Sequence, residues 1–182
     1  MAEAGLLVLV VGPSGAGKDT LLDCARSLLD DEAAVVFPRR EITRAQDAGG
    51  EDHVEVSRET FDLRDASGAY ALSWSAHGLG YGVPAAIAGD IAAGRRVVVN
   101  VSRGVVEAAR ARFAKVRVVT ITANASILAQ RLARRGRETQ AEIEARLSRA
   151  DAVEVAGDDV VEVRNEGEVV AGVAQLLDAI RR

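Results

Sequence analysis

A glycine-rich loop between a buried strand and a helix limits the folds that this sequence can adopt. Residues Leu6–Val11 read LLVLVV, a continuous apolar run that is typical of a central strand in a parallel sheet. The next segment, GPSGAGK, ends at Lys18, and apolar residues then recur at helical spacing to Leu29. The loop matches the phosphate-binding pattern GxxxxGK[ST] except at its last position, which is Asp19.

A phosphate-binding loop needs consecutive backbone N–H groups that point into one concavity. Glycines allow the necessary backbone conformations, the following helix adds the positive end of its dipole, and lysine supplies charge to the β- and γ-phosphates. A ligand-free glycine turn is disfavoured because the whole pattern falls in the right context, and the spacing GxxGxG excludes the dinucleotide pattern GxGxxG. We predict that a nucleotide binds to Gly12, Pro13, Ser14, Gly15, Ala16, Gly17, Lys18, Asp19 and Thr20.

Asp19 stands where the pattern has a hydroxyl that ligates Mg²⁺. A carboxylate is also a hard oxygen ligand and suits Mg²⁺, directly or through a water molecule. Alternatively, Asp19 stabilises only the N-terminus of the helix, and Thr20 or a water molecule completes the metal shell. The sequence leaves both interpretations open, and both retain the nucleotide site.

Strands and helices alternate along most of the chain, which predicts a three-layer α/β fold with a parallel sheet. We expect strands at 6–11, 35–37, 97–101, 116–122 and 160–164. We expect helices near 18–29, 103–113, 125–134 and 139–154, and a further helix at the end of the chain.

The interval from about 45 to 82 departs from this alternation. It is rich in Gly, Asp, Glu and Ser and contains short alternating pieces such as HVEVS. We interpret it as a small inserted substrate lobe over the carboxyl edge of the sheet, where folds of this kind bind ligands. We expect the 182 residues to form a single domain around the phosphate-binding loop, with its core at 1–44 and 83–182.

Charge and residue content exclude several classes of protein. The net charge of −4 disfavours nucleic-acid and membrane-surface binding, which need a basic excess. Lysine occurs only at 18 and 115, so the chain lacks the NKxD element of GTP-switch proteins. The single cysteine, Cys24, cannot form an intramolecular disulfide and favours a cytoplasmic location, while Leu6–Val11 is too short to span a membrane. The sequence leaves a homodimer open.

Arginine gathers in two segments, RREITR (39–44) and RLARRGRE (131–138), and Arg146 follows the second. For Arg131 alone, a solvated helix face is a sufficient explanation. The glycine-interrupted cluster favours a mobile lid over about 131–146 that closes on triphosphate oxygens. A phosphate acceptor is already an anionic nucleophile, so the reaction needs neutralisation of charge and in-line positioning rather than a general base.

Several motifs together resemble the guanylate-kinase-like branch of the nucleoside monophosphate kinases. They are GPSGAGK (12–18), RxxTR (40–44), YG (81–82), RxxRRGR (131–137) and NEG (165–167). The chain is still more similar to the ribose 1,5-bisphosphate phosphokinases, a phosphonate-pathway family of the same fold. The segments that carry this resemblance are GPSGAGKD (12–19), ITR (42–44), EDHV (51–54), ALSWSAHGLGYGV (71–83), VVVNVSR (97–103), RLARRGRE (131–138) and EIEARL (142–147). Asp19 is a feature that this family shares.

The resemblance implies transfer of the γ-phosphate of ATP, with Mg²⁺, to the 1-phosphate of ribose 1,5-bisphosphate. The catalytic charges would be Lys18, Arg135, Arg137 and Arg146, and Asn165 would belong to an adenine-side loop. The candidates for binding the sugar bisphosphate are Arg40, Thr43, Arg44, His53, His77, Tyr81, Asn100 and Arg103. For the two histidines we favour hydrogen-bonding or structural roles, and Trp74 is interpreted as a core residue.

Two departures from guanylate kinases favour an acceptor without a base, and a third concerns the metal site. Asp47 lies near the place of their second arginine, and His53 replaces a tyrosine, which weakens a base-stacking and phosphate-gripping pocket. Asn100 replaces an aspartate at the end of the third strand, and an amide cannot neutralise Mg²⁺, which makes Asp19 the candidate metal ligand. The alternatives are a guanylate kinase that acts on GMP and a catalytically silent interaction module.

Overall fold

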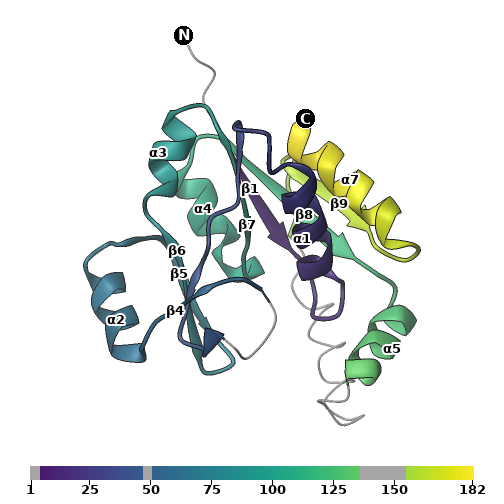
Figure 1. Ribbon diagram of the computed structural model, residues 1–182, viewed down its shortest axis with the longest axis horizontal. Helices are drawn as coiled ribbons and strands as arrows, with labels where there is room; N and C mark the ends of the chain where they lie inside the picture. The colour runs from purple at the N-terminus through teal and green to yellow at the C-terminus, as the bar shows by residue number, and fades with distance from the viewer. Residues whose placement is uncertain (1–4, 47–50, 136–154) are drawn as a thin grey trace.

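The computed structural model describes residues 5–46, 51–135 and 155–182 (Figure 1), with the side chain of Arg135 left aside. Its main feature is a five-stranded sheet in which every pairing is parallel, with the order β2-β7-β1-β8-β9. The strands are β1 (Leu6–Val11), β2 (Val35–Val36), β7 (Arg96–Asn100), β8 (Val116–Thr122) and β9 (Val160–Arg164). The predicted α/β fold is confirmed, and the expected strand bounds agree to within one residue.

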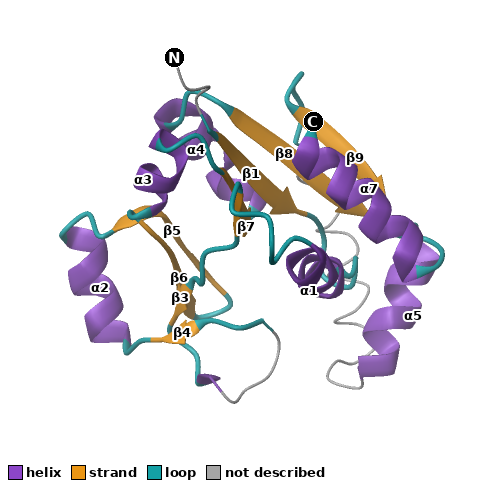
Figure 2. Cartoon of the chain, turned by 45° about the horizontal axis from the view of Figure 1, so that its top comes forward, coloured by secondary structure: helices purple, strands orange, loops and turns teal. Residues whose placement is uncertain are grey.

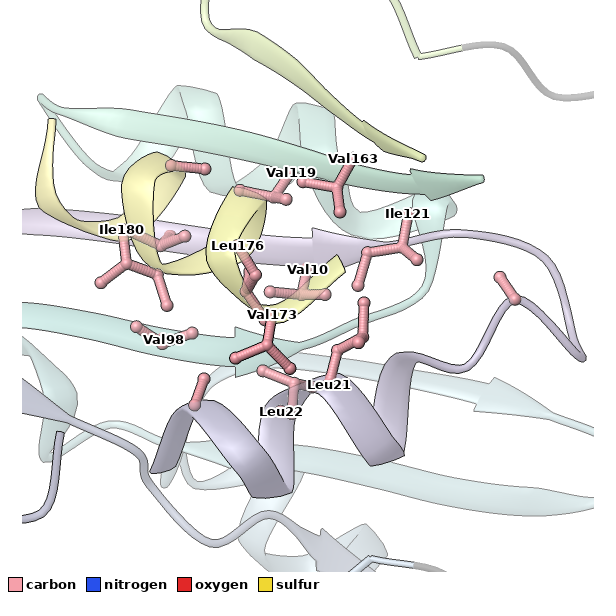
Figure 3. Close-up of a cluster of buried hydrophobic side chains, with 14 of the residues drawn as sticks. Val10, Leu21, Leu22, Val98, Val119, Ile121, Val163, Val173, Leu176 and Ile180 are labelled. Atoms are coloured by element: carbon pink, nitrogen blue, oxygen red, sulfur yellow. The ribbon is translucent and has the colours of Figure 1, made fainter. Parts of the chain in front are cut away.

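Helices cover both faces of this sheet, so the fold has three layers (Figure 1). Helices α1 (Lys18–Leu28) and α7 (Val169–Arg181) pack on one face, where their apolar side chains meet those of β1, β8 and β9 (Figure 3). Helices α3 (Ile87–Ala92) and α4 (Val106–Arg112) pack on the other face. A 3₁₀ turn, Arg103–Val105, leads into α4, and α5 (Ala125–Arg135) follows β8. The helix expected at 139–154 lies outside the described residues.

The first apolar cluster anchors the loop-bearing helix. Leu21, Leu22 and Ala25 lie at helical spacing on α1 and are buried. They join Leu176 and Ile180 of α7, which are fully buried, in one cluster with the β-branched residues of the sheet (Figure 3). This packing fixes α1 against the sheet, and therefore fixes the direction in which its N-terminus points.

A second sheet of four strands forms the lobe, with the order β4-β3-β6-β5. Its strands are β3 (Glu41–Ile42), β4 (Val54–Glu55), β5 (Tyr70–Ala76) and β6 (Leu79–Pro84), and helix α2 (Arg58–Ala66) packs beside it (Figure 2). The sheet extends beyond the expected interval of 45–82 at both ends. Strand β6 itself continues to Pro84, and the two-residue strand β3 adds to the sheet before residue 45 by pairing with β6. A strand so short carries no periodic signal in the sequence.

The base of the lobe shares a hydrophobic cluster with the core. Ala71 and Leu72 of β5 and Val83 of β6 are buried in the same cluster as Val97 and Val99 of β7. The far end of the β5–β6 hairpin is a two-residue turn in which His77 and Gly78 both have positive φ, as a type I′ turn requires. In the described part of the chain, no helix is long and apolar enough to cross a membrane.

Candidate nucleotide and acceptor sites

The glycine loop has the backbone that a phosphate cradle needs. Gly12, Gly15 and Gly17 have φ values of 148°, 88° and 89°, which side-chain-bearing residues rarely adopt. A Cβ at Gly12 would lie 2.2 Å from the backbone oxygen of Ile121, and one at Gly17 would lie 2.4 Å from Nδ2 of Asn165. Conformation and packing therefore both require glycine at these positions.

Lys18 is the first residue of α1, and its side chain turns back over the loop. Its Nζ donates hydrogen bonds to the backbone oxygens of Gly12 (2.8 Å) and Pro13 (2.9 Å). Gly17 occupies the N-cap and has no side chain to cap the helix, so N–H groups of the first turn are available to a ligand. The loop thus presents an ammonium group and a helix N-terminus together, which is the arrangement that binds a triphosphate.

Asn165 holds the backbone of the glycine loop through a hydrogen bond. Its side chain is 4% exposed, and Nδ2 donates a 2.7 Å hydrogen bond to the backbone oxygen of Ala16. Arg131 adds to this contact, since its guanidinium donates to the backbone oxygens of Asn165 (2.8 Å) and Ala16 (3.3 Å). The structure therefore places Asn165 against the backbone of the loop, and Arg131 is not on a solvated helix face as its sequence pattern alone indicated.

Asp19 and Asn100 meet at the carboxyl edge of the main sheet. Asp19 lies in the first turn of α1, Asn100 ends β7, and Nδ2 of Asn100 donates a 3.2 Å hydrogen bond to Oδ1 of Asp19. The described residues contain no group of three or more His, Cys, Asp or Glu side chains that could hold a metal ion. The donor set fits Mg²⁺ all the same, because this ion takes one or two carboxylates and completes its shell with substrate phosphates and water.

A pocket opens beside Asp19, between α1, the end of β7, the segment that joins β2 to β3, and residues 51–52. Its lining is Asp19, Leu22, Asp23, Arg26, Phe37, Pro38, Arg40, Glu51, Asp52, Val98, Val99 and Asn100. Among the substrate residues expected from the sequence, only Arg40 and Asn100 line it. The pocket begins where the loop ends, so a ligand in it would lie next to the terminal phosphate of a nucleotide.

Arg40 is held in one position by a carboxylate and two aromatic rings. It is 8% exposed, its Nε donates a 2.8 Å hydrogen bond to Oε1 of Glu51, and a second guanidinium nitrogen contacts Oε2. The rings of Trp74 and Tyr81 stack with centroids 5.2 Å apart, and the guanidinium lies 5.4 and 5.3 Å from their centroids. Trp74 packs on the core and also supports Arg40, and Tyr81 contributes its ring to this support.

Thr43 and His53 use their polar atoms inside the lobe. The hydroxyl of Thr43 accepts a 2.8 Å hydrogen bond from the backbone N–H of Gly80. His53 is fully buried, and its two ring nitrogens lie 3.0 Å from the backbone oxygens of Glu51 and Arg44. The ring therefore joins the chain on both sides of residues 47–50, which agrees with the structural role favoured for it.

The other candidates lie elsewhere in the fold. His77 is exposed in the hairpin turn, and Arg103 begins the 3₁₀ turn before α4. Arg44 follows β3, and its buried Nε has no hydrogen-bond partner among the residues that the structure describes. Arg135 ends α5, while the predicted lid residues Arg137 and Arg146 lie outside the described residues.

The sequence did not reveal four charged residues of the pocket, namely Asp23, Arg26, Glu51 and Asp52. Asp23 and Arg26 follow Asp19 at helical spacing, which was the available signal, whereas the Glu51–Arg40 pair depends on the folding of the lobe. Burial raises the pKa of Asp23, Arg26 opposes this rise, and the carboxylates of Asp19, Glu51 and Asp52 add to it. The pocket is thus a charged site in which carboxylates outnumber arginines.

The parallel sheet, the loop and the pocket beside it define a P-loop nucleotide-binding protein. A family model described as an AAA domain matches residues 8–154. A ribose 1,5-bisphosphate phosphokinase PhnN from Acidiphilium cryptum is 59% identical, over 88% of this chain and 85% of that protein. A second PhnN protein, from Rhodopseudomonas palustris, is 48% identical over 97% of this chain and 89% of its own length. The chain belongs to the PhnN family of ribose 1,5-bisphosphate phosphokinases.

A solved structure supports the fold. A guanylate kinase from Anaplasma phagocytophilum superposes with a TM-score of 0.66, over 98% of this chain and 85% of that chain, at 19% sequence identity. At this identity the likeness extends to the fold alone. The family identifies a kinase that uses a nucleotide and acts on a small molecule.

Proposed function

We propose that this protein transfers the γ-phosphoryl group of ATP to the 1-phosphate of ribose 1,5-bisphosphate. The products are 5-phosphoribosyl 1-diphosphate and ADP. The observation that carries the proposal is the 59% identity to a PhnN phosphokinase over 88% of this chain. An oxygen of the acceptor phosphate attacks the γ-phosphorus, and the bond from the γ-phosphorus to the bridging β,γ-oxygen breaks.

The residues of the chain supply charge and position rather than a base. The loop N–H groups and Lys18 bind the phosphates of ATP, and Asp19 with Asn100 or Thr20 would hold Mg²⁺. When bound, Mg²⁺ neutralises charge on the phosphate oxygens. Arg40, fixed by Glu51, Trp74 and Tyr81, faces the acceptor. The lid of about 131–146, with Arg135, Arg137 and Arg146, and the lobe as a substrate unit are part of this proposal.

Product analysis with two acceptors tests the proposal. The purified protein is incubated with ATP and Mg²⁺ and with either ribose 1,5-bisphosphate or GMP, and products are followed by ³¹P NMR. We expect a diphosphate resonance of 5-phosphoribosyl 1-diphosphate with the first acceptor and little GDP with the second. Efficient formation of GDP without turnover of the sugar bisphosphate would identify a guanylate kinase instead. Loss of turnover in Lys18→Ala, with the fold retained, would exclude a contaminating kinase.

A further inference from the structure

Arg26 is a charged residue of the pocket to which neither the loop nor the acceptor chemistry has assigned a role. It lies in the third turn of α1, and Asp19, Asp23 and Arg26 follow one another at positions i, i+4 and i+7 on one face of the helix. All three line the pocket. At a rise of 1.5 Å per residue, Arg26 lies about 10 Å beyond Asp19 along the helix axis.

The guanidinium of Arg26 packs on an aromatic ring and makes no close ion pair with the described residues. It lies 5.7 Å from the centroid of the Phe37 ring, which is a cation–π contact. Among the described residues, its buried Nε has no hydrogen-bond partner. Asp23 attracts it electrostatically, but no carboxylate in the described part of the chain lies within ion-pair distance of it, whereas Arg40 is already paired with Glu51. A buried donor without a partner is costly in a folded protein and calls for a ligand or another explanation.

The charges of the pocket make this residue important for an anionic acceptor. Asp19, Asp23, Glu51 and Asp52 contribute four carboxylates, against two arginines. A sugar bisphosphate brings two phosphate groups into this negative environment. The reacting phosphate must lie near Asp19 and the γ-phosphate, and the ribose ring and its exocyclic carbon separate the second phosphate from the first. A second phosphate at that separation can reach the later turns of α1, because the pocket extends from Asp19 to Arg26.

We propose that Arg26 binds the non-reacting phosphate, the 5-phosphate, of the acceptor and thereby selects a sugar bisphosphate over a sugar with a single phosphate. This inference rests on the proposed function, because it names the part of the acceptor that Arg26 recognises. A guanidinium presents paired N–H donors that fit phosphate oxygens, and the Phe37 ring restricts the plane in which it lies.

Two competing sugar phosphates separate this role from a structural one. Ribose 5-phosphate retains the 5-phosphate, and ribose 1-phosphate lacks it. In Arg26→Ala we expect the inhibition constant of ribose 5-phosphate and the KM of ribose 1,5-bisphosphate to rise roughly ten- to hundredfold, because a charged hydrogen bond to the 5-phosphate is lost. The inhibition constant of ribose 1-phosphate and the KM of ATP should change less than about twofold. Arg181→Ala, which removes an arginine paired with Glu32 at the end of α7, is the matched control and should leave all four constants unchanged.

The outcomes distinguish this inference from the proposed function. If the wild-type protein forms no 5-phosphoribosyl 1-diphosphate, the proposed function fails. If the wild-type protein forms this product but ribose 5-phosphate does not compete with the acceptor, the role of Arg26 is overturned. The role is also overturned if Arg26→Ala changes the inhibition constants of both sugar phosphates equally or changes neither. If Arg26→Ala does not fold, Arg26→Lys carries the test, because it keeps the charge and loses the paired donors. Arg26→Lys should raise the inhibition constant of ribose 5-phosphate at least about threefold and leave that of ribose 1-phosphate unchanged. An equal effect on both constants would overturn the inference.

Discussion

The side-chain amide of Asn165 donates a 2.7 Å hydrogen bond to the backbone oxygen of Ala16, across 149 positions of the sequence. Asn165→Asp keeps the shape of this side chain but replaces the donor with an oxygen that faces another oxygen. We expect the free energy of unfolding to fall by about 1–3 kcal/mol, because a buried acceptor loses its partner. We also expect the KM of ATP to rise, because the loop is less well held.

Urea denaturation and steady-state kinetics measure these two effects. The neighbouring Glu166 is exposed, so Glu166→Gln serves as a control and should change neither. An unchanged KM for ATP in a destabilised Asn165→Asp protein would show that the hydrogen bond supports the fold but not the nucleotide site.

Lys18 should be essential for turnover and dispensable for folding. Its ammonium group donates hydrogen bonds to two backbone oxygens of the loop, and in a complex with a nucleotide it would bind the phosphates instead. We expect Lys18→Met to lower kcat at least about a hundredfold, as the loss of a transition-state donor does. Circular dichroism should show an unchanged fold. Lys115, the other lysine of the sequence, supplies the control, since Lys115→Met should keep the wild-type rate.

Asp19 should set the requirement for Mg²⁺. If its carboxylate is a metal ligand, Asp19→Asn lowers the affinity for the ion, because an amide carries no charge. We expect the Mg²⁺ concentration for half-maximal activity to rise, and binding of Mn²⁺ to the complex with an ATP analogue, followed by electron paramagnetic resonance, to weaken. An unchanged metal requirement would transfer the role to Thr20 or to water and leave Asp19 a helix-terminal charge.

The Arg40–Glu51 pair should stabilise the lobe and position Arg40. The side chains are 10% and 17% exposed, so removal of one partner leaves a nearly buried charge. We expect Glu51→Gln to lower the free energy of unfolding by about 3 kcal/mol and to raise the KM of the acceptor but not that of ATP. Glu55→Gln on the exposed strand β4 is the control. The double variant Arg40→Met, Glu51→Met should be more stable than the sum of the single changes predicts.

Tyr70 should make stability depend on alkaline pH. Its hydroxyl donates a 2.6 Å hydrogen bond to Oε2 of Glu41, and burial, followed by this bond, raises the pKa of Tyr70. The folded state therefore holds the phenolic proton more tightly than the unfolded state. This stabilisation is complete below the ordinary tyrosine pKa of about 10 and is lost as the pH rises above it.

Thermal melts between pH 8 and pH 11 check this sign. The wild-type Tm should fall above about pH 10 by more than the Tm of Tyr70→Phe. At pH 8, Tyr70→Phe should be less stable by about 1–3 kcal/mol, because Glu41 loses a buried donor and retains Arg64 at 3.0 Å. Parallel Tm curves at alkaline pH would contradict the proposed linkage.

Sequence patterns predicted the elements whose signals are local. The apolar runs located the strands of the main sheet, and the glycine spacing located the loop next to Lys18, because each pattern is read within a few consecutive residues. The resemblance to PhnN proteins added the substrate class, which no pattern of this length carries. The two-residue strand β3 was missed because it exists only through pairing with β6.

Parts of the site could not be predicted from the sequence because their contacts join residues that are far apart in it. Arg131 reaches the loop across 115 positions, and an isolated arginine on a helix gives no sign of this. The Arg40–Glu51 pair spans 11 positions, and the ring nitrogens of the buried His53 lie 3.0 Å from the backbone oxygens of Glu51 and Arg44. Arg26 differs, since its helical spacing from Asp19 is visible in the sequence, but its buried Nε is a property of the fold.

The hydrophobic cluster shared by Ala71, Leu72 and Val83 with the main sheet restricts how the enzyme changes shape during a reaction cycle. Rotation of the lobe as a rigid body would pull these side chains out of the interior and expose them to water. We therefore expect enclosure of the acceptor to come from bending of the outer half of the β5–β6 hairpin, beyond this anchored base. Trp74 packs against the edge of this cluster and stacks on Tyr81, so it lies where the bend would begin, and indole fluorescence would respond to it.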